Sequence, residues 1–505
     1  MSNPLHEALF APHAGRNSTF LILPDGARIS HERFLARAAR FAHALASFGV
    51  KPGDRVAVQV AKSPDALALY AACVQAGAVF LPLNTAYLPQ EVAYFLGDAE
   101  PALFVVAPDA RDTLAPVAAG AGAGIATLGA TGEGTFAEAA GLQDESFTPV
   151  ARDVNDLAAI LYTSGTTGRS KGAMLSQGNL LSNAQVLARE WRFSSDDILL
   201  HALPVFHTHG LFVATNVSLI AGGAMILLPK FDTDEIFRLL PQATTMMGVP
   251  TFYTRLVTDQ RLSRAATEHM RLFVSGSAPL LAQTHHAFEE KTGQVILERY
   301  GMTELNMAVS NPYAGERRPG TVGLPLPGVE VRIRDDDGQD LPANTPGMIE
   351  VRGPNVFQGY WRMPEKTAEE LRPDGFFITG DIGTQSADGY VTIVGRARDM
   401  VIAGGFNIYP AEIESVIDAL PGVQESAVIG VPHPDLGEGV VAVIVPRDGK
   451  APDASEVTTA CATRLAPFKV PRRIVVVDEL PRNTMGKVQK AALRERFASL
   501  FTDPA

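Results

Sequence analysis

The hydrophobic positions in the first half of the chain predict strands that alternate with helices. Apolar runs of strand length occur at Val56–Val60, Val79–Leu83 and Leu157–Leu161. Between such runs, residues 34–45 carry apolar side chains at the spacing of one helix face, and Gly49 marks the end of that helix. Strands that alternate with helices are typical of mostly parallel sheets with helices on both faces. We therefore expect an α/β fold, with α+β features where the alternation breaks down.

Turn and cap signals fix some boundaries within this pattern. Asp25-Gly26 predicts the turn of a hairpin that runs from Thr19 to Ile29. Ser63 followed by Pro64 is typical of a helix start, because Pro at the first helical position loses no hydrogen bond. By contrast, residues 115–142 are rich in Ala and Gly, and we expect this stretch to be peripheral and loosely specified.

The chain of 505 residues is too long for one hydrophobic core, so at least two domains are expected. The charged segment 395–399 interrupts the apolar pattern. The following residues predict a compact α/β segment that is large enough to fold separately. Its expected strands are 401–402, 427–431, 440–445 and 474–477, and its expected helices are 411–420 and 455–465.

Composition and charge narrow the functional classes. The net charge of −12 argues against a general nucleic-acid binder, which needs a basic face. No apolar run is long enough to cross a membrane, and the N-terminus lacks the basic start and apolar core of a secretion signal. Cys73 and Cys461 stand alone in apolar surroundings, which is typical of core residues in a reducing compartment. A soluble cytoplasmic protein that acts on small molecules is the expectation.

The strongest candidate for chemistry is the segment Thr163–Gly172, which follows the predicted strand 157–161. Its glycines allow sharp turns that aim backbone N–H groups at one point, its hydroxyls add donors, and Arg169 and Lys171 add positive charge. Such a loop binds phosphates, although the spacing does not fit the common G-x-x-x-x-G-K-[ST] phosphate loop. A polar surface turn explains the same residues about equally well.

Further candidates follow along the chain. His207 and His209 lack acidic or Cys partners at ligand spacing, so a histidine at a pocket mouth, or a capped loop histidine, is a better interpretation than a metal site. Small residues at 276–278 end a strand and allow a flat ring to lie against the backbone. Asp381 is expected at a strand–loop junction, where it could accept two hydrogen bonds from a ribose, or simply close a tight turn. Lys487 follows a Gly turn on a loop expected to be exposed.

Five ordered motifs together carry a resemblance over essentially the whole chain. They are Thr163–Gly172, Tyr300–Glu304, Thr379–Asp381, Gly395–Ile408 and Pro481–Lys487. In these motifs the chain resembles the AMP-forming acyl-CoA synthetases of the adenylate-forming superfamily. The resemblance implies two half-reactions: a carboxylate and ATP give an acyl-adenylate and pyrophosphate, and the thiol of CoA then displaces AMP. It implies ATP, Mg²⁺ and CoA as cofactor and co-substrates.

The resemblance also implies roles for individual residues. The β- and γ-phosphates would be bound by Thr163, Ser164, Gly165, Thr166, Thr167, Gly168 and Lys171. Adenine would lie between Tyr300 and the segment Gly276, Ser277 and Ala278, with the ribose on Asp381 near Arg396. Thr303 would meet the α-phosphate, Glu304 would bind Mg²⁺, and Lys487 would bridge the α-phosphate and the substrate carboxylate.

The family alternates between its half-reactions by rotating a small C-terminal domain. The resemblance implies a large N-terminal domain, residues 1–397, with parallel-rich sheets that bind ATP and the acid, and a mobile α+β domain, residues 398–505. Arg398 occupies the hinge position, and Gly404 and Gly405 would approach the thiol of CoA after rotation. In bacterial members the lysine at the position of Lys487 is reversibly acetylated, so an acetyltransferase and a deacetylase are possible partners.

The acid is suggested by Arg299 and Gly301, which flank the tyrosine of the second motif. Gly301 stands where acetate-activating relatives have a bulky Trp, and Arg299 would meet a second carboxylate on the substrate; His207 and Ser277 would line the same pocket. This resembles the malonyl-CoA synthetase branch and predicts malonate, and also methylmalonate, as substrates. The alternatives are a medium-chain or aryl-acid CoA ligase in which Arg299 faces solvent or pairs with Glu298, a ligase that loads a carrier protein, and a nucleotide-binding regulator without catalysis.

Overall fold

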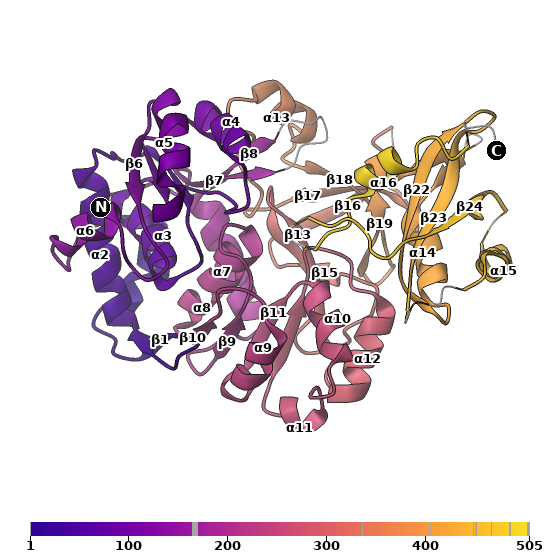
Figure 1. Cartoon of the computed structure of the whole chain (residues 1–505), viewed down its shortest axis with the longest axis horizontal. Coiled ribbons are helices and arrows are strands. Elements are labelled where there is room, and N and C mark those ends of the chain that lie inside the picture. The colour runs from indigo at the N-terminus through magenta and orange to yellow at the C-terminus, as the bar shows by residue number, and fades with distance from the viewer. Residues whose placement is uncertain are drawn as a thin grey trace.

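Helices and mostly parallel strands alternate through the first part of the chain, as the hydrophobic pattern predicts (Figure 1). The computed structural model describes residues 2–163, 170–335, 337–403, 406–447, 449, 452–465, 467–483 and 486–501. These residues form four sheets, and the last sheet belongs to a small C-terminal domain beside a much larger N-terminal domain. Of the helices in this part of the chain, none has the length and apolar character needed to span a bilayer.

The first sheet has the strand order β6-β5-β3-β4-β7-β8 over the described residues. Its strands are β3 (Arg55–Gln59), β4 (Val79–Pro82), β5 (Leu103–Val106), β6 (Gly124–Thr127), β7 (Leu157–Thr163) and β8 (Lys171–Ser176). All neighbours are parallel except β7 and β8. The helices along this sheet are α2 (His31–Ser47), α3 (Pro64–Ala76), α4 (Pro89–Ala99), α5 (Arg111–Gly120) and α6 (Thr135–Gly141). Alternate strand residues face α3 on one side and α4 with α5 on the other, so both faces are covered.

The second sheet has the order β15-β14-β13-β12-β11-β9-β10-β1-β2 in the described chain. The strands are β1 (Thr19–Ile22), β2 (Arg28–Ser30), β9 (Ile198–His201), β10 (Ala224–Leu227), β11 (Thr245–Gly248), β12 (Leu272–Ser275), β13 (Leu297–Met302), β14 (Asn306–Ser310) and β15 (Leu324–Pro325). Its helices are α8 (Asn216–Ala221), α9 (Thr233–Leu239), α10 (Pro250–Thr258), α11 (Arg264–Thr267) and α12 (Ala282–Thr292). β1 and β2 form the predicted hairpin, and the strands from β1 to β13 through β10, β9, β11 and β12 are parallel.

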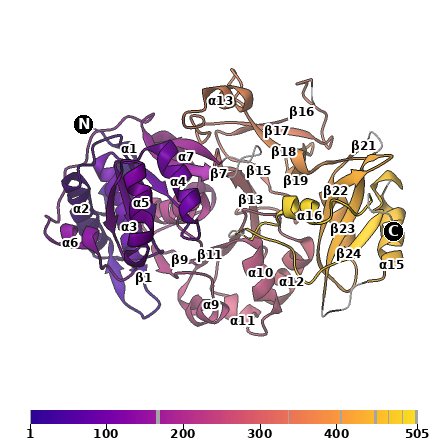
Figure 2. The same cartoon turned by 45° about the horizontal axis from the view of Figure 1, so that its top comes forward.

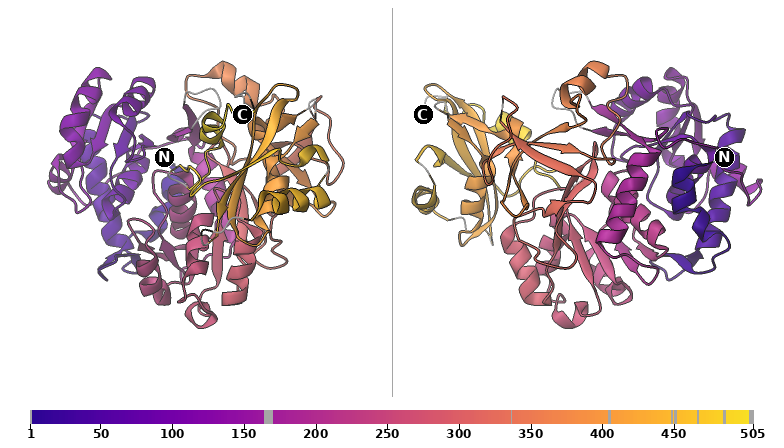
Figure 3. Two further views of the ribbon diagram at one scale, coloured as in Figure 1. Left: turned by 45° about the vertical axis from the view of Figure 1, so that its right-hand side comes forward. Right: turned by 180° about the vertical axis from the view of Figure 1, so that it is seen from behind.

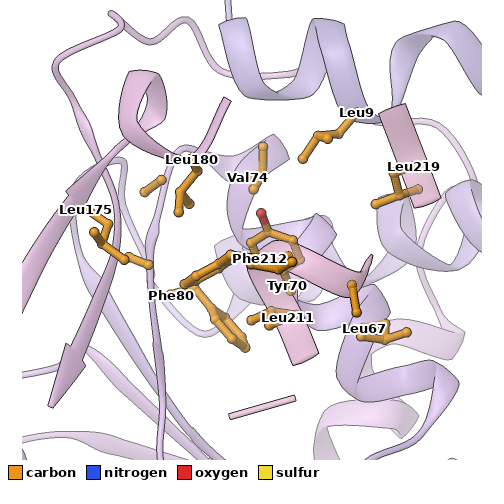
Figure 4. Packing of buried hydrophobic residues seen from close by; sticks show 14 of the residues in the cluster. Leu9, Leu67, Tyr70, Val74, Phe80, Leu175, Leu180, Leu211, Phe212 and Leu219 are labelled. Atoms are coloured by element: carbon orange, nitrogen blue, oxygen red, sulfur yellow. The ribbon is translucent and has the colours of Figure 1, made fainter. Parts of the chain in front are cut away.

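The two sheets are joined through one hydrophobic core (Figure 4). Tyr70 and Val74 of α3 meet Phe212 of a π-helix (His209–Thr215) and Leu180 of α7 (Gln177–Glu190). The hydroxyl of Tyr70 accepts a hydrogen bond of 3.2 Å from the amide of Asn216, so this buried polar group is satisfied. The packing of α1 (Pro4–Leu9) against α3 and α7 closes the same core, which holds the carboxyl ends of both sheets in a fixed relation.

The remaining sheets lie toward the C-terminal side of the molecule (Figure 2). The third contains β16 (Glu330–Arg334), β17 (Gly347–Arg352), β18 (Phe377–Gln385) and β19 (Val391–Arg396), with α13 (Pro364–Glu370) beside it. The fourth contains β20 (Val401–Ala403), β21 (Phe406–Ile408), β22 (Val423–His433), β23 (Gly437–Pro446) and β24 (Arg473–Val476), with α14 (Pro410–Asp418), α15 (Ala454–Arg464) and α16 (Lys490–Arg496). The short 3₁₀ turn Ala397–Asp399 connects the two sheets, and Figure 3 shows the C-terminal domain from two further sides.

The prediction for residues 115–142 is wrong. Residues 115–142, expected to be loosely specified, include most of α5, the parallel edge strand β6 and helix α6. Phe136 of α6 is fully buried against Phe41 of α2, with ring centroids 5.1 Å apart. Alanine favours helix wherever a few larger side chains supply the packing. The Ala- and Gly-rich composition therefore gave no indication of these ordered elements, although a few apolar contacts are enough to stabilise them.

Candidate active site

The carboxyl ends of the two parallel sheets open into one cavity of about 830 Å³. Segments that follow β4 and β7 line it from the first sheet, and segments that follow β9, β12 and β13 line it from the second. Residues 378–380 of β18 and the loop around Lys487 close it from the C-terminal side. Open α/β sheets bind ligands at the carboxyl ends of their strands, and the volume suits a nucleotide with a small second substrate.

Most of the predicted site residues that the structure describes meet at this cavity. Its walls include Thr163, Lys171, His207, Ser277, Arg299, Gly301, Thr303, Glu304, Arg396, Arg398 and Lys487. Gly276, Ala278, Tyr300 and Asp381 adjoin these residues in the chain or by contact but are not part of the walls. Ser164, Gly165, Thr166, Thr167 and Gly168 of the phosphate-type loop, and Gly404 and Gly405, lie outside the described residues.

Arg299 brings an uncompensated positive charge to one end of the cavity. The parallel register of β12 and β13, with Ser275 opposite Glu298, places the guanidinium directly on Gly276. A Cβ atom at Gly276 would lie 2.2 Å from Cζ of Arg299, so a larger residue at position 276 would displace the guanidinium from this position. Arg299 is 3 % exposed, and its Nε and Nη2 atoms have no hydrogen-bond partner among the described residues.

Both alternative positions for Arg299 are excluded. Its side chain does not reach solvent, and the neighbouring Glu298 carboxylate lies 3.1 Å from Nδ1 of the buried His285 instead. Adjacent strand residues point to opposite faces, which explains why the two side chains do not meet. Burial lowers the pKa of Arg299 to about 9, so the group is still a cation at neutral pH. A buried cation without a partner is costly, and this end of the cavity is therefore suited to an anion.

Two neutral histidines stand beside this cation. Burial, and then the charge of Arg299, lower the pKa of His207 to about 4 and lower that of His209 well below its ordinary value. The backbone N–H of His209 donates to Nδ1 of His207 at 3.3 Å, and Oγ of Ser277 lies 3.2 Å from Nδ1 of His209. Ser277 has a φ of +74°, a conformation unusual for a non-glycine residue and common at functional sites. The histidines therefore contribute donors rather than additional positive charge.

Backbone packing, in addition to the predicted size of the acyl pocket, requires glycine at position 301. The pairing of β13 with β14 shifts register between Tyr300 and Gly301. A Cβ atom at Gly301 would come within 1.8 Å of the backbone oxygen of Asn306. The position therefore excludes any side chain through backbone packing, in addition to leaving the cavity open.

The end of the cavity lined by Thr163 and Lys171 contains a network of opposite charges. Nζ of Lys171 lies 3.0 and 3.2 Å from the two carboxylate oxygens of Glu370, and 4.0 Å from the centre of the Tyr360 ring. The Tyr360 hydroxyl lies 2.6 Å from Glu370 and 3.1 Å from Glu304. Glu304 also accepts from the hydroxyl of Thr163 at 3.4 Å, and burial raises its pKa. Sequence reasoning had found Lys171, Thr163 and Glu304 but not Tyr360 or Glu370.

Asp381 organises the part of the site expected to bind the nucleoside. It accepts from Tyr300 at 2.6 Å and pairs with Nε of Arg396 at 2.8 Å, while its backbone N–H donates to Thr379. The prediction that Asp381 ends a strand is wrong, because β18 continues to Gln385 and pairs with β19 opposite Arg396. The sequence Gly380-Asp381 alone is typical of a turn. Because β19 pairs with β18 along this stretch, the strand continues through both residues.

Lys487 reaches the cavity from the C-terminal domain. The prediction of an exposed position is wrong, since its side chain lines the cavity. Burial, followed by the charges of Arg396 and Arg398, lowers the pKa of Lys487 to about 8. The turn that carries it touches the N-terminal domain: a Cβ atom at Gly486, whose φ is +73°, would lie 3.0 Å from Thr251 of α10. Only tertiary contact between domains could reveal this placement.

Carboxylates and lysines line a cavity large enough for a nucleotide, and the comparison with known proteins identifies the family. Residues 10–361 match the family of AMP-binding enzymes, and residues 412–487 match the AMP-binding enzyme C-terminal domain. The chain belongs to the AMP-binding enzymes. The resemblance to AMP-forming acyl-CoA synthetases predicted from five motifs is thereby confirmed, as is the α/β fold with a large N-terminal and a small C-terminal domain.

Three proteins with similar sequences are relatives of this AMP-binding enzyme. MatB from Rhodopseudomonas palustris is 56 % identical over 99 % of this chain and 100 % of its own, with a TM-score of 0.97 for its ATP-bound structure and 0.87 for its apo structure. A malonate–CoA ligase from Arabidopsis thaliana is 36 % identical over 89 % of this chain and 79 % of its own length. A feruloyl-CoA synthase from Amycolatopsis sp. is 37 % identical over 98 % of both chains.

Proposed function

We propose that this enzyme is a malonate–CoA ligase. It would activate malonate with ATP as an acyl-adenylate, release pyrophosphate, and transfer the malonyl group to CoA with release of AMP. The malonate–CoA ligase and the feruloyl-CoA synthase have about equal sequence identity to this chain. Identity to these two relatives therefore does not indicate which acid is the substrate. The observation that carries the proposal is the buried guanidinium of Arg299 at one end of the cavity, whose Nε and Nη2 atoms have no hydrogen-bond partner among the described residues.

The charge of Arg299 favours a diacid over other substrates. The second carboxylate of malonate can accept two parallel charge-assisted hydrogen bonds from the guanidinium. A fatty or aryl acid would leave the same cation buried and unpaired, which is unfavourable. Methylmalonate fits the same site, because one added methyl group changes binding in an apolar pocket by only about 1–3 kcal/mol. The neutral His207, together with Ser277, supports orientation of the acid without attracting a second anion.

The first half-reaction joins two anions, so the residues around the cavity must neutralise charge. The substrate carboxylate oxygen attacks the α-phosphorus of ATP, and the bond to pyrophosphate breaks. Lys487 would hold the attacking carboxylate and the α-phosphate, with Thr303 as a further donor to that phosphate, and Lys171 would hold the outer phosphates. Asp381, which is held by its ion pair with Arg396, would accept hydrogen bonds from the ribose hydroxyls. Stacking of Tyr300 and of residues 276–278 on adenine remains a prediction.

Glu304 fits a Mg²⁺ ion that binds together with ATP. It is a nearly buried carboxylate on the cavity wall, and no cluster of three or more possible metal ligands occurs among the described residues. One carboxylate plus substrate phosphates is a common ligand set for Mg²⁺. When bound, the ion would neutralise phosphate charge. The raised pKa of Glu304 is consistent with a carboxylate that gains stability as an anion when a cation arrives.

The second half-reaction would follow rotation of the C-terminal domain about Arg398. The domain boundary after Ala397 is supported by the turn Ala397–Asp399, which connects the third and fourth sheets. Lys487 and CoA cannot both occupy the space beside the carbonyl, so the loop of Lys487 must leave. The higher TM-score to ATP-bound than to apo MatB supports the interpretation that this arrangement is the one for adenylation. Approach of Gly404 and Gly405 to the thiol of CoA is part of this proposal.

Two finer points also remain proposals. Buried, unpaired Cys73 and Cys461 favour a reducing compartment such as the cytoplasm. Acetylation of Lys487 would remove the positive charge that the first half-reaction needs, so an acetyltransferase acting on it would switch that step off.

An acid panel in a CoA-dependent AMP-release assay tests the proposal. Malonate should give the highest kcat/KM, ahead of butyrate, ferulate and acetate. Arg299→Met, which keeps the volume but removes the charge, should lower kcat/KM for malonate by roughly 10–100-fold and that for butyrate by less than about threefold. Arg299→Lys should recover part of the malonate activity. Equal losses for both acids, or a wild-type preference for ferulate, would reject the assignment.

A further inference from the structure

The carboxylate of Glu370 is the centre of an ionic network at the phosphate end of the cavity. It receives the ammonium of Lys171 on both oxygens, at 3.0 and 3.2 Å, and that of Lys366 at 3.0 Å. The Lys171 side chain is only 7 % exposed, so its charge depends on this partner. The same carboxylate lies 2.6 Å from the hydroxyl of Tyr360, which is itself 3.1 Å from Glu304.

The fold places Glu370 there against a local electrostatic preference. It is the last residue of α13, where the helix dipole disfavours negative charge. The Tyr360 hydroxyl, followed by the two lysines, compensates and holds the pKa of Glu370 below its ordinary value although burial opposes this. A second contact fixes the helix to the tyrosine, because Thr367 accepts a hydrogen bond of 2.8 Å from the backbone N–H of Tyr360. Tyr360 and Glu370 are therefore held as one unit.

We propose that Glu370 and Tyr360 are positioning residues for Mg²⁺–ATP, an inference that rests on the proposed phosphate role of Lys171 and metal role of Glu304. Glu370 holds the ammonium of Lys171 at the cavity wall and leaves its third proton for a phosphate oxygen. Tyr360 connects Glu370 to Glu304 and fixes the orientation of the carboxylate expected to bind the metal. Neither residue forms or breaks a bond in the reaction.

Substitutions of Glu370 and Tyr360 should affect nucleotide binding differently in the presence and absence of Mg²⁺. Glu370 acts on Lys171, which would contact phosphate whether or not a metal is present. Loss of its charge should therefore weaken nucleotide binding both with and without Mg²⁺. The Tyr360 hydroxyl is its contact with Glu304. When that hydroxyl is removed, the ring stays against Lys171, and Lys171 and Lys366 still pair with Glu370. Loss of the hydroxyl should therefore change the Mg²⁺ requirement and leave metal-free nucleotide binding nearly unchanged.

Calorimetric titration of the full chain with a non-hydrolysable ATP analogue tests this without any acid substrate. Glu370→Gln should weaken analogue binding by about tenfold at both zero and saturating Mg²⁺, and Glu370→Asp should recover part of the loss. Tyr360→Phe should raise the Mg²⁺ concentration for half-maximal analogue binding several-fold. Glu369→Gln is the matched control, because this exposed neighbour bonds to Lys366 but not to Lys171, and its affinity should stay within about twofold of wild type.

Several results would overturn the inference. These are analogue binding to Glu370→Gln that is unchanged or tighter, an equal loss in Glu369→Gln, or an unchanged Mg²⁺ requirement in Tyr360→Phe. Thermal unfolding of each variant identifies a folding defect, and if Glu370→Gln is unfolded then Tyr360→Phe alone decides. Because no acid is present, a wrong choice of malonate would not alter these affinities. Failure of the wild type to bind the analogue would instead reject the ligase function and this inference with it.

Discussion

The pKa of Lys487 makes the two half-reactions separable by pH. Burial and the cations of Arg396 and Arg398 lower this pKa to about 8, against the opposing effect of Asp381 and Asp399. With that value about 90 % of the enzyme carries the ammonium at pH 7 and about 10 % at pH 9. Because the charged form is proposed to neutralise the attacking carboxylate and the α-phosphate, kcat/KM of adenylation should fall about tenfold over this interval.

The sign of the effect follows from the charge that is lost. Deprotonation removes a positive group from a step that accumulates negative charge, so activity is present below pH 8 and lost above it. Bound ATP adds phosphate anions near Lys487, which favour the protonated form and raise its pKa. The inflection in kcat should therefore lie at a higher pH than the inflection in kcat/KM, since the former reports the enzyme–substrate complex.

Pyrophosphate release at pH 6.5–9.5 measures the first half-reaction, and thioester formation from supplied malonyl-adenylate at one fixed pH isolates the second. Lys487→Arg keeps a charge throughout this range, so its adenylation, although slower, should lose the inflection near pH 8. Lys487→Ala should reduce adenylation by about 10²–10³-fold and largely spare thioester formation. An inflection that persists in Lys487→Arg, or equal damage to both half-reactions in Lys487→Ala, would refute this reasoning.

Two further predictions concern other carboxylates. Asp381→Asn removes the ionic partner of Arg396, so the KM for ATP should rise at least about tenfold with a smaller change in kcat; an unchanged KM in steady-state kinetics would contradict the ribose role. In α14, burial and then Glu414 and Glu425 raise the pKa of Asp418 to about 7. The folded state therefore retains a proton that the unfolded state loses near pH 4, and stability declines as pH rises from 4 to 7. Asp418→Asn should stabilise the C-terminal domain to urea by about 3–4 kcal/mol at pH 8 and by nothing at pH 4; an equal gain at both pH values would contradict this.

Most of the fold could be predicted because its signals are local. Ser63 and Gly77 bound α3 with a side-chain cap and a left-handed residue, as their sequence positions indicate. The alternation of strands and helices likewise predicted the parallel sheets. The failures were not local: the strand β18 continues past Asp381 because β19 pairs with it, and Lys487 is covered because another domain touches its turn.

The same distinction explains which site residues were missed. Lys171 and Glu304 stand in motifs of unusual composition, so their chemistry was visible in the sequence. Tyr360 and Glu370 lie about 190 residues beyond Lys171, in a segment whose Glu and Lys residues look like an ordinary solvated helix. Only the tertiary contact of α13 with β8 turns one of these carboxylates into the partner of a buried lysine.

The cations around the cavity differ in how they are neutralised, and this difference indicates what each is expected to bind. Arg396 has Asp381, and Lys171 has Glu370, so both groups are held in place before any ligand arrives. Arg299 and Lys487 are less well compensated: two buried nitrogens of Arg299 have no hydrogen-bond partner among the described residues, and the pKa of Lys487 is lowered although Asp381 and Asp399 oppose this. In a protein with a net charge of −12, two undercompensated cations at one cavity are maintained at a cost in stability. Malonate has two carboxylates, one for each of these cations, and a monocarboxylic acid would relieve only one of them.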